Sequence, residues 1–261
     1  MRSLPWFSLD EYQRMIEAFV RAGYEVRTVG QMGAEAEGPV LYLRHDVDFH
    51  LFRQDEMAQR DAQAEVKSTF FVLVQGHYNP MLVENAKVLE RIVGLGHEVG
   101  LHYDLRNYPP SNEEARARLE HEVRTLEYVT GKPVASISMH EPSAGHVDWF
   151  RNTESFVHPH ADRFSQDLLY VSDSCRAWRD ENLLRCFSED RPRRVLLNTH
   201  GELWLDPTVT ERTDYLKRVS APSASHFANE YFHEYITSVW QTHEAARLDD
   251  ERRASDATRD D

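Results

Sequence analysis

The chain has 261 residues, a length that a single α/β barrel domain reaches, and 41% of them are hydrophobic, as in globular proteins. A formal net charge of -14 argues against nucleic acid as the main partner, because phosphate binding needs a basic surface. The two cysteines, Cys175 and Cys186, are too few for a disulfide scaffold and predict reduced thiols.

The sequence also bears on location. No apolar run reaches the roughly 18 residues that a membrane span needs, and the segment MRSLPWFSLDEYQRM lacks the apolar stretch of a secretory signal. We therefore expect a cytoplasmic protein with no membrane partner. If it acts on a carbohydrate, the substrate is then a precursor or a small molecule rather than an assembled wall polymer. Nothing in the sequence indicates the oligomeric state.

Helical and strand patterns alternate along the chain. The first helix is predicted from Ser8, which has capping-box spacing to Glu11, and Gly23 suits its C-terminal stop. Further helices are predicted at 52–64, 80–96, 111–131, 209–218 and 224–246, and strands at 24–29, 40–45, 66–74, 97–104, 133–140, 168–174 and 193–200. Such alternation predicts a parallel sheet with crossover helices. We expect one domain over residues 1–246 and a disordered, charged tail at 247–261.

Polar, reactive residues follow the apolar bodies of five predicted strands. They are Asp46 and Asp48, His102, His140, Asp173, and His200. In parallel α/β folds, active sites collect at the carboxyl ends of the strands. We therefore expect these side chains to lie close together.

The residue types indicate a metal-dependent hydrolase. Asp48, His102 and His140 can supply one oxygen and two nitrogens to zinc or a related divalent ion. A catalytic metal lowers the pKa of its bound water from 15.7 to about 7. Asp46 would then take a proton from that water, and His200 would protonate a leaving group.

Several segments resemble, in order, the motifs of the polysaccharide deacetylases, the NodB-homology group of carbohydrate esterases (family four). They are RHDVD, STFFVL, GHEVGLH, YVSDSCRAWR and LLNTH. The resemblance spans residues 40 to 204. It implies a distorted (β/α) barrel that hydrolyses N-acetyl groups or other C–N bonds with one divalent metal ion. We expect Zn²⁺, with Fe²⁺, Co²⁺ or Ni²⁺ as alternatives.

Roles carry over from the family by position. Asp46 matches the family's base, Asp48 its metal-binding Asp, His102 the first His of its His-x-x-x-His pair, and His200 its general acid.

The sequence departs from the family at two motifs, and the first departure leaves a metal ligand unassigned. The second His of the pair would fall on Arg106, and the Arg-x-Pro motif has no counterpart. We expect His140, in SMHEPS, to supply the missing ligand, with Asp104 as the rival. If neither binds, the site is weak or inactive.

Other residues are candidates for supporting roles. Arg44 could orient a carboxylate, as the missing Arg motif would have done, and Asp173 with Arg179 could form a buried pair behind the site. The candidates for contact with substrate are Tyr78, Tyr103, Trp178 and Trp204, with core packing as the alternative for the last three. We expect His45 and His97 to be structural, and the loop histidines His158 and His160 not to bind metal.

The combined expectation is a deacetylase for a small acetamido compound, such as an N-acetylated sugar, a nucleotide sugar or a glycosylated metabolite. Two alternatives stay open. One is another C–N hydrolase, acting on a cyclic amide or ureide. The other is a metal-free, sugar-binding pseudoenzyme, which Arg106 favours.

Overall fold

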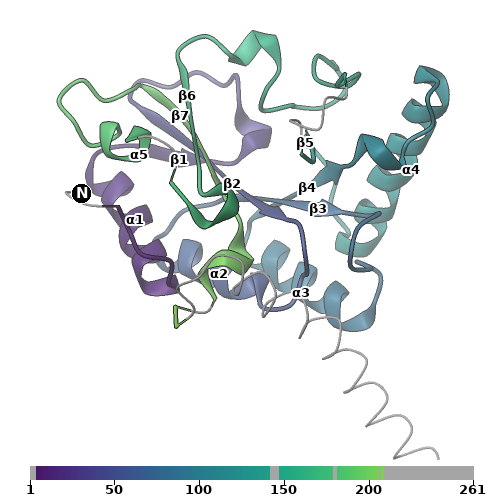
Figure 1. Ribbon diagram of the computed structural model, residues 1–261, viewed down its shortest axis with the longest axis horizontal. Helices are drawn as coiled ribbons and strands as arrows, with labels where there is room; N and C mark the ends of the chain where they lie inside the picture. The colour runs from purple at the N-terminus through teal and green to yellow at the C-terminus, as the bar shows by residue number, and fades with distance from the viewer. Residues whose placement is uncertain (1–3, 142–146, 179–180, 206, 209–261) are drawn as a thin grey trace, which may run out of the picture. The chain divides into compact units, whose positions relative to one another are not determined.

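A parallel β-sheet organises the chain in the computed structural model, which describes residues 4–141, 147–178, 181–205 and 207–208 (Figure 1). These residues belong to the first of the two units into which the chain divides, residues 1–215. The predicted helices at 209–218 and 224–246 and the tail at 247–261 lie outside the described residues. The single domain over residues 1–246 therefore stays a prediction.

All seven strands of the sheet pair in parallel. They are β1 Glu25–Arg27, β2 Val40–Val47, β3 Thr69–Leu73, β4 Glu98–Tyr103, β5 Ile137–Met139, β6 Leu168–Ser172 and β7 Arg194–Thr199. The order is β5-β4-β3-β2-β7-β6, and β1 also pairs with β2. The sheet curls into a half-barrel, which confirms the predicted distorted (β/α) barrel (Figure 1).

Helices connect the strands, as the alternation of patterns predicted. They are α1 Leu9–Arg21, α2 Gln54–Gln63, α3 Val83–Gly94, α4 Asn112–Thr130 and the short α5 Asn182–Arg185. The predicted start of α1 is confirmed, because the Ser8 hydroxyl accepts a hydrogen bond from the Glu11 amide at 3.2 Å. Gly131 ends α4 with φ at +64°, a conformation that glycine adopts without a steric penalty.

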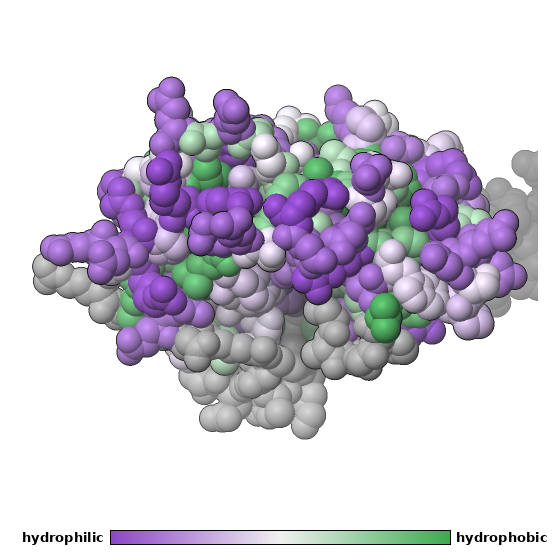
Figure 2. All heavy atoms as spheres, turned by 90° about the horizontal axis from the view of Figure 1, so that it is seen from above, coloured by the Kyte–Doolittle hydropathy of each residue, from purple (hydrophilic) through white to green (hydrophobic). Residues whose placement is uncertain are grey.

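One face of this unit can be described by the hydropathy of its side chains. Hydrophilic side chains cover most of the face shown in Figure 2, with hydrophobic side chains visible between them. None of the helices in the described part of the chain combines the length and the apolar character needed to cross a membrane. Cys186 is a buried free thiol.

Strand β2 is buried at all eight of its positions. Successive side chains of a strand point to opposite faces. Arg44 and Asp46 therefore share one face of the sheet, and His45 points to the other, where α1 and α2 pack.

A buried polar network fills the helix-covered face. The Asp61 carboxylate accepts hydrogen bonds from the Tyr12 hydroxyl at 2.6 Å and the Ser68 hydroxyl at 2.6 Å. It also lies 2.9 Å from Nε2 of His45, whose Nδ1 lies 2.7 Å from the Thr199 hydroxyl. All five side chains are buried. This network ties α1 and α2 to β2 and β7, which is the structural role predicted for His45.

Asp61 generates a prediction about stability. Replacing it with Ala would remove the nearest acceptor of three buried donors, those of Tyr12, Ser68 and His45, and each group left unsatisfied costs about 1–3 kcal/mol. We expect Asp61→Ala to lower the free energy of unfolding, measured in urea, by at least about 3 kcal/mol.

The matched control is Asp10→Ala, because Asp10 is an exposed partner of Arg60. That change should cost less than about 1 kcal/mol. A loss of less than about 1 kcal/mol for Asp61→Ala would show that the network does not stabilise the fold.

Candidate functional site

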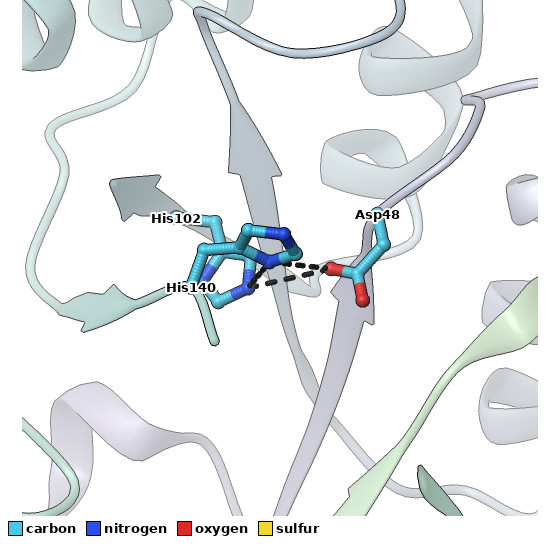
Figure 3. Close-up of side chains that lie close together, drawn as sticks. All are labelled: Asp48, His102 and His140. Carbon is cyan, nitrogen blue, oxygen red and sulfur yellow. Dashed lines mark hydrogen bonds and ion pairs between the residues drawn. The ribbon is translucent and has the colours of Figure 1, made fainter. Parts of the chain in front are cut away.

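Three side chains converge at the carboxyl edge of the sheet (Figure 3). Asp48 follows β2, His102 lies in β4, and His140 follows β5. Asp48 Oδ1 lies 3.4 Å from His102 Nε2 and 3.2 Å from His140 Nδ1. The same two ring nitrogens are 3.2 Å apart. One oxygen and two nitrogens therefore face a common point.

The donor set fits a divalent metal ion. His102 Nδ1 lies 2.9 Å from the Ser138 carbonyl. A carbonyl can only accept, so Nδ1 carries a hydrogen, and Nε2 is the nitrogen that faces the cluster and can bind a metal when it is deprotonated. Asp48 Oδ1 is a buried atom that accepts no hydrogen bond from the described residues. Burial alone would raise the pKa of Asp48, but His102 and His140 hold it well below its ordinary value, so the carboxylate is ionised.

Asp104, the rival ligand, points elsewhere. Its carboxylate accepts hydrogen bonds from Arg106, with Nε at 2.9 Å from Oδ1 and Nη2 at 2.7 Å from Oδ2. Arg106 Nη1 lies 2.7 Å from Glu141 Oε2. Among the described residues, the group placed to hold a metal contains His140 and not Asp104.

Asp46 lies beside this cluster in a buried, hydrogen-bonded setting. Its Oδ1 accepts from Arg44 Nε at 2.9 Å, and its Oδ2 accepts from Asn198 Nδ2 at 2.8 Å. Burial alone would raise the pKa of Asp46, but Arg44, helped by His102 and His200, brings it to about 2. Arg44 therefore does hold a carboxylate, as the sequence suggested.

Asn198 was not anticipated from the sequence. It is the residue of β7 that lies directly opposite Arg44 in the register of β2 and β7. Its position could have identified it, because Asn198 lies two residues before His200 in a mainly apolar strand.

His200 is held by a buried carboxylate. Its Nδ1 lies 2.6 Å from Asp173 Oδ1, and Asp173 Oδ2 accepts a hydrogen bond from the Trp204 indole at 2.7 Å. The other ring nitrogen, Nε2, lies 3.6 Å from Asp48 Oδ2. Burial alone would lower the pKa of His200, but Asp173 outweighs it and raises that pKa well above its ordinary value. His200 is therefore protonated at neutral pH.

A pocket of about 600 Å³ opens beside the cluster. Its wall includes Asp48 and His140 of the cluster, together with Phe49 and His77. The Phe49 and His77 rings are nearly parallel, with an interplanar angle of 11° and centroids 6.2 Å apart. One phenyl ring and one imidazole ring therefore lie in the pocket wall next to the cluster, whose other lining residues are mostly polar.

Two of the four residues predicted to contact substrate are too buried to do so. Tyr103 and Trp204 are both 0% exposed, so the prediction that they line a pocket is wrong, and the core-packing alternative applies. Trp178 stacks on Phe7 at 6.0 Å and donates to the Pro5 carbonyl. Arg179 lies outside the described residues.

The Tyr78 hydroxyl joins the ends of two strands by hydrogen bonds. Its hydroxyl donates to the Val47 carbonyl at 2.7 Å and accepts from the Leu73 amide at 3.0 Å. These contacts fix the end of β2 next to Asp48. They show a structural role for Tyr78, and its contact with substrate stays a prediction.

His97, His158 and His160 have structural partners among the described residues. His97 contacts the Ser68 amide at 3.2 Å and the Ala58 carbonyl at 2.9 Å. His158 Nε2 lies 3.3 Å from an Asp148 oxygen, and the His160 ring packs edge-on against Tyr170. These contacts show structural roles for the three histidines, and the absence of metal binding at His158 and His160 stays a prediction.

Glu202 is a second residue that sequence reasoning missed. Its side chain is buried, and its Oε2 accepts a hydrogen bond from Gln54 Nε2 at 3.1 Å. Burial, together with the negative charge of Asp48, raises the pKa of Glu202 to about 8. The sequence signal was its place two residues after His200, in HGELW.

Comparisons with known proteins give fold similarity only. No protein-family model matches the chain, and no curated protein is similar to it in sequence. Solved structures with a similar fold include a pseudoenzyme of the CE4 family from Bacillus anthracis, with 19% identity and a TM-score of 0.42. That match covers 72% of this chain and 62% of the other, which is less than two thirds of its length.

Two further structures are similar. The peptidoglycan deacetylase PdaC from Bacillus subtilis has 16% identity and a TM-score of 0.44, over 72% of this chain and 86% of the other. A polysaccharide deacetylase from Bacillus cereus has 17% identity and a TM-score of 0.45, over 69% and 86%. The CE4 family, carbohydrate esterase family four, is the one whose motifs the sequence resembles.

The His200–Asp173 contact generates a prediction about titration. Because Asp173 raises the pKa of His200, Asp173→Asn should lower it. In the native, metal-free chain, NMR should show the His200 signal, identified by its loss in His200→Ala, titrating well above the ordinary pKa of a histidine. In the Asp173→Asn variant the same resonance should titrate at lower pH. An unchanged titration curve would mean that Asp173 does not set the charge of His200.

Proposed function

We propose that the chain is a metal-dependent hydrolase that removes an N-acetyl group from a small acetamido substrate. The proposal rests on the observation that a set of possible metal ligands, an ionised carboxylate and a protonated imidazole lie together at one edge of the sheet. The motif resemblance supplies the reaction class. The pocket next to the cluster supports a substrate of small-molecule size.

Asp48, His102 and His140 would hold the metal ion. The donor set of two imidazoles and one carboxylate suits Zn²⁺, and Fe²⁺, Co²⁺ and Ni²⁺ accept the same ligand types. When bound, the ion would supply Lewis-acid polarisation of the amide carbonyl and of the attacking water.

Asp46 is the proposed base. Its Oδ2 lies 3.9 Å from His102 Nε2, so this oxygen is on the side of the cluster. Arg44 and Asn198 hold the carboxylate in place, and the low pKa keeps it ionised and able to accept a proton. The same contacts make Asp46 a weak base, so it needs a nucleophile whose own proton has been made acidic.

His200 is the proposed acid. Asp173 holds its Nδ1, which leaves Nε2–H directed toward Asp48 and the cluster. A protonated imidazole there can give its proton to the nitrogen of a departing amine. Asp173 stabilises the positive charge that makes this transfer possible.

The first prediction of this proposal concerns metal content. Purified protein should hold close to one divalent ion per chain. The ion should be lost in His102→Ala and in His140→Ala, because each removes a ligand. Asp104→Ala is the matched control and should keep it, since Arg106 engages that carboxylate.

Mass spectrometry of the metal would decide between the alternatives. Loss with His102→Ala but not with His140→Ala would return the third ligand to Asp104. A native chain that takes up no metal under any loading condition would favour the sugar-binding pseudoenzyme.

The second prediction concerns turnover on a panel of acetamido sugars, nucleotide sugars and cyclic amides. We expect release of acetate from the acetamido compounds. Asp46→Asn should lower turnover by about 10²–10⁴-fold, the usual contribution of general acid–base catalysis. Activity on the cyclic amides alone would change the substrate class to the cyclic C–N hydrolases.

A double variant shows whether a loss of turnover in Asp46→Asn comes from misfolding. Asp46→Asn alone leaves the buried Arg44 charge without its partner, which can destabilise a protein by about 3–5 kcal/mol. Arg44→Gln combined with Asp46→Asn removes both charges, and the loss of turnover should persist in it. Near-native activity in either folded variant would contradict the assignment of the base.

A further inference from the structure

A second pocket lies at the opposite edge of the sheet from the candidate site. It has a volume of about 680 Å³ and borders the first residues of β2, β6 and β7, which are Val40, Leu168 and Arg194. The cluster around Asp48 stands at the carboxyl edge of the same sheet, so the two sites are separate. The volume of the second pocket is in the range of pockets that bind small molecules.

Positive charge gathers in the wall of this pocket. Among the described residues that line it are three arginines, Arg185, Arg193 and Arg194, and one acidic residue, Asp167. The whole chain has a net charge of -14, so this local excess of positive charge runs against its composition. A concave wall that carries charge of one sign concentrates ions of the opposite sign. The wall therefore favours an anion.

The three guanidinium groups are oriented by neutral acceptors. Arg193 Nη2 donates to the Glu37 carbonyl at 2.9 Å, and Arg194 Nη1 donates to the Gln166 carbonyl at 3.2 Å. Arg185 Nη1 donates at 3.2 Å to a side-chain amide oxygen at the start of α5. None of the three forms an ion pair with a carboxylate in the part of the chain that the structure describes. The contacts therefore fix the groups and leave their charge uncompensated.

A buried tyrosine adds a hydroxyl group to the pocket wall. Tyr42 lies in β2, is only 2% exposed and borders the pocket. Within the described ranges its hydroxyl forms no hydrogen bond. A buried tyrosine hydroxyl usually has a partner. The pocket is the open space beside Tyr42, so a ligand in it can supply that partner.

We propose that this pocket binds a small phosphate monoester that carries a ring, such as a nucleotide or a sugar phosphate. At pH 7 such a phosphate has a charge between about -1.5 and -2 and three oxygens that accept hydrogen bonds, which suits three arginines beside one aspartate. The planar fork of an arginine pairs with two phosphate oxygens at once. Leu168 and Leu169 offer an apolar surface for the ring. The proposal is independent of the proposed function.

Binding is measured by isothermal titration calorimetry on the full chain, freed of metal because phosphate groups also bind metal ions. The probes are adenosine monophosphate (AMP), glucose-6-phosphate, inorganic phosphate and adenosine. We expect one of the two esters to bind most tightly, which distinguishes a nucleotide from a sugar phosphate. Its affinity should fall as salt is raised from about 0.1 M to about 1 M, because salt screens the attraction.

Gly38 allows a change of charge that leaves the arginines in place. It lines the pocket, and a Cβ atom added to it would meet no heavy atom within 4 Å apart from its chain neighbours. Gly38→Glu should weaken binding of the tighter ester by about 10-fold or more, because it adds a like charge to the wall. Gly38→Gln has the same size without the charge and is the matched control, which should bind as the native chain does.

A second variant removes a positive charge from the pocket. Arg194→Gln should weaken binding of the same ester by about 10-fold or more, the usual contribution of a hydrogen bond to a charged group. The control is Arg163→Gln, because Arg163 also donates to backbone carbonyls and has no described carboxylate partner, yet it is not among the described residues that line the pocket. Thermal melts of each variant show whether the fold is kept.

Four results would overturn the proposal. Equal affinity in Gly38→Glu and Gly38→Gln would place the bound ester elsewhere on the chain. Adenosine binding as tightly as AMP would show that the arginines do not recognise the phosphate. Inorganic phosphate binding as tightly as both esters would show that the ring makes no contact. The fourth result is that neither ester binds to the native chain at millimolar concentration.

Discussion

The burial of charge in the central strand β2 constrains the rest of the structure. Every residue of β2 is buried, yet it carries Arg44, His45 and Asp46 in succession. Buried polar groups must find partners, and the alternation of a strand sends these side chains to opposite faces. His45 finds Asp61 and Thr199 under the helices, while Arg44 and Asp46 pair with each other on the other face.

The two faces are thereby linked through one strand. The Asp61 network fixes β2 against α1, α2 and β7. Asp46 directly follows His45 in the chain, so the network that anchors His45 also fixes the position of Asp46. The polar network on the helix side is therefore part of the geometry of the site, although none of its members reaches the pocket.

The charges of the site explain why a cation suits it. Arg44 compensates Asp46, and His200 compensates Asp173. Among the described residues, Asp48 has no arginine partner and lies instead among the imidazoles of His102, His140 and His200. Burial, and after it the negative charge of Asp48, raise the pKa of Glu202. A cation held by Asp48, His102 and His140 would offset the negative charge of Asp48.

The sequence predicted the elements and the members of the cluster, because both follow from local patterns. Apolar strands ending in Asp48, His102 and His140 could be read directly, and parallel pairing brings such ends together. The aromatic residues were harder to place, because an apolar ring suits a core as well as a pocket. Trp204 is buried because its indole serves Asp173, a partner 31 positions away that no local pattern identifies.

The roles of Asn198 and Glu202 could not be predicted from local sequence patterns either. Their roles depend on register and on burial, since Asn198 acts through its position opposite Arg44 and Glu202 through its enclosure with Gln54. The departure at Arg106 is different, because the sequence showed that a ligand was missing. Only the fold shows that the end of β5 places His140 beside Asp48 and His102, and that Arg106 pairs with Asp104 and Glu141.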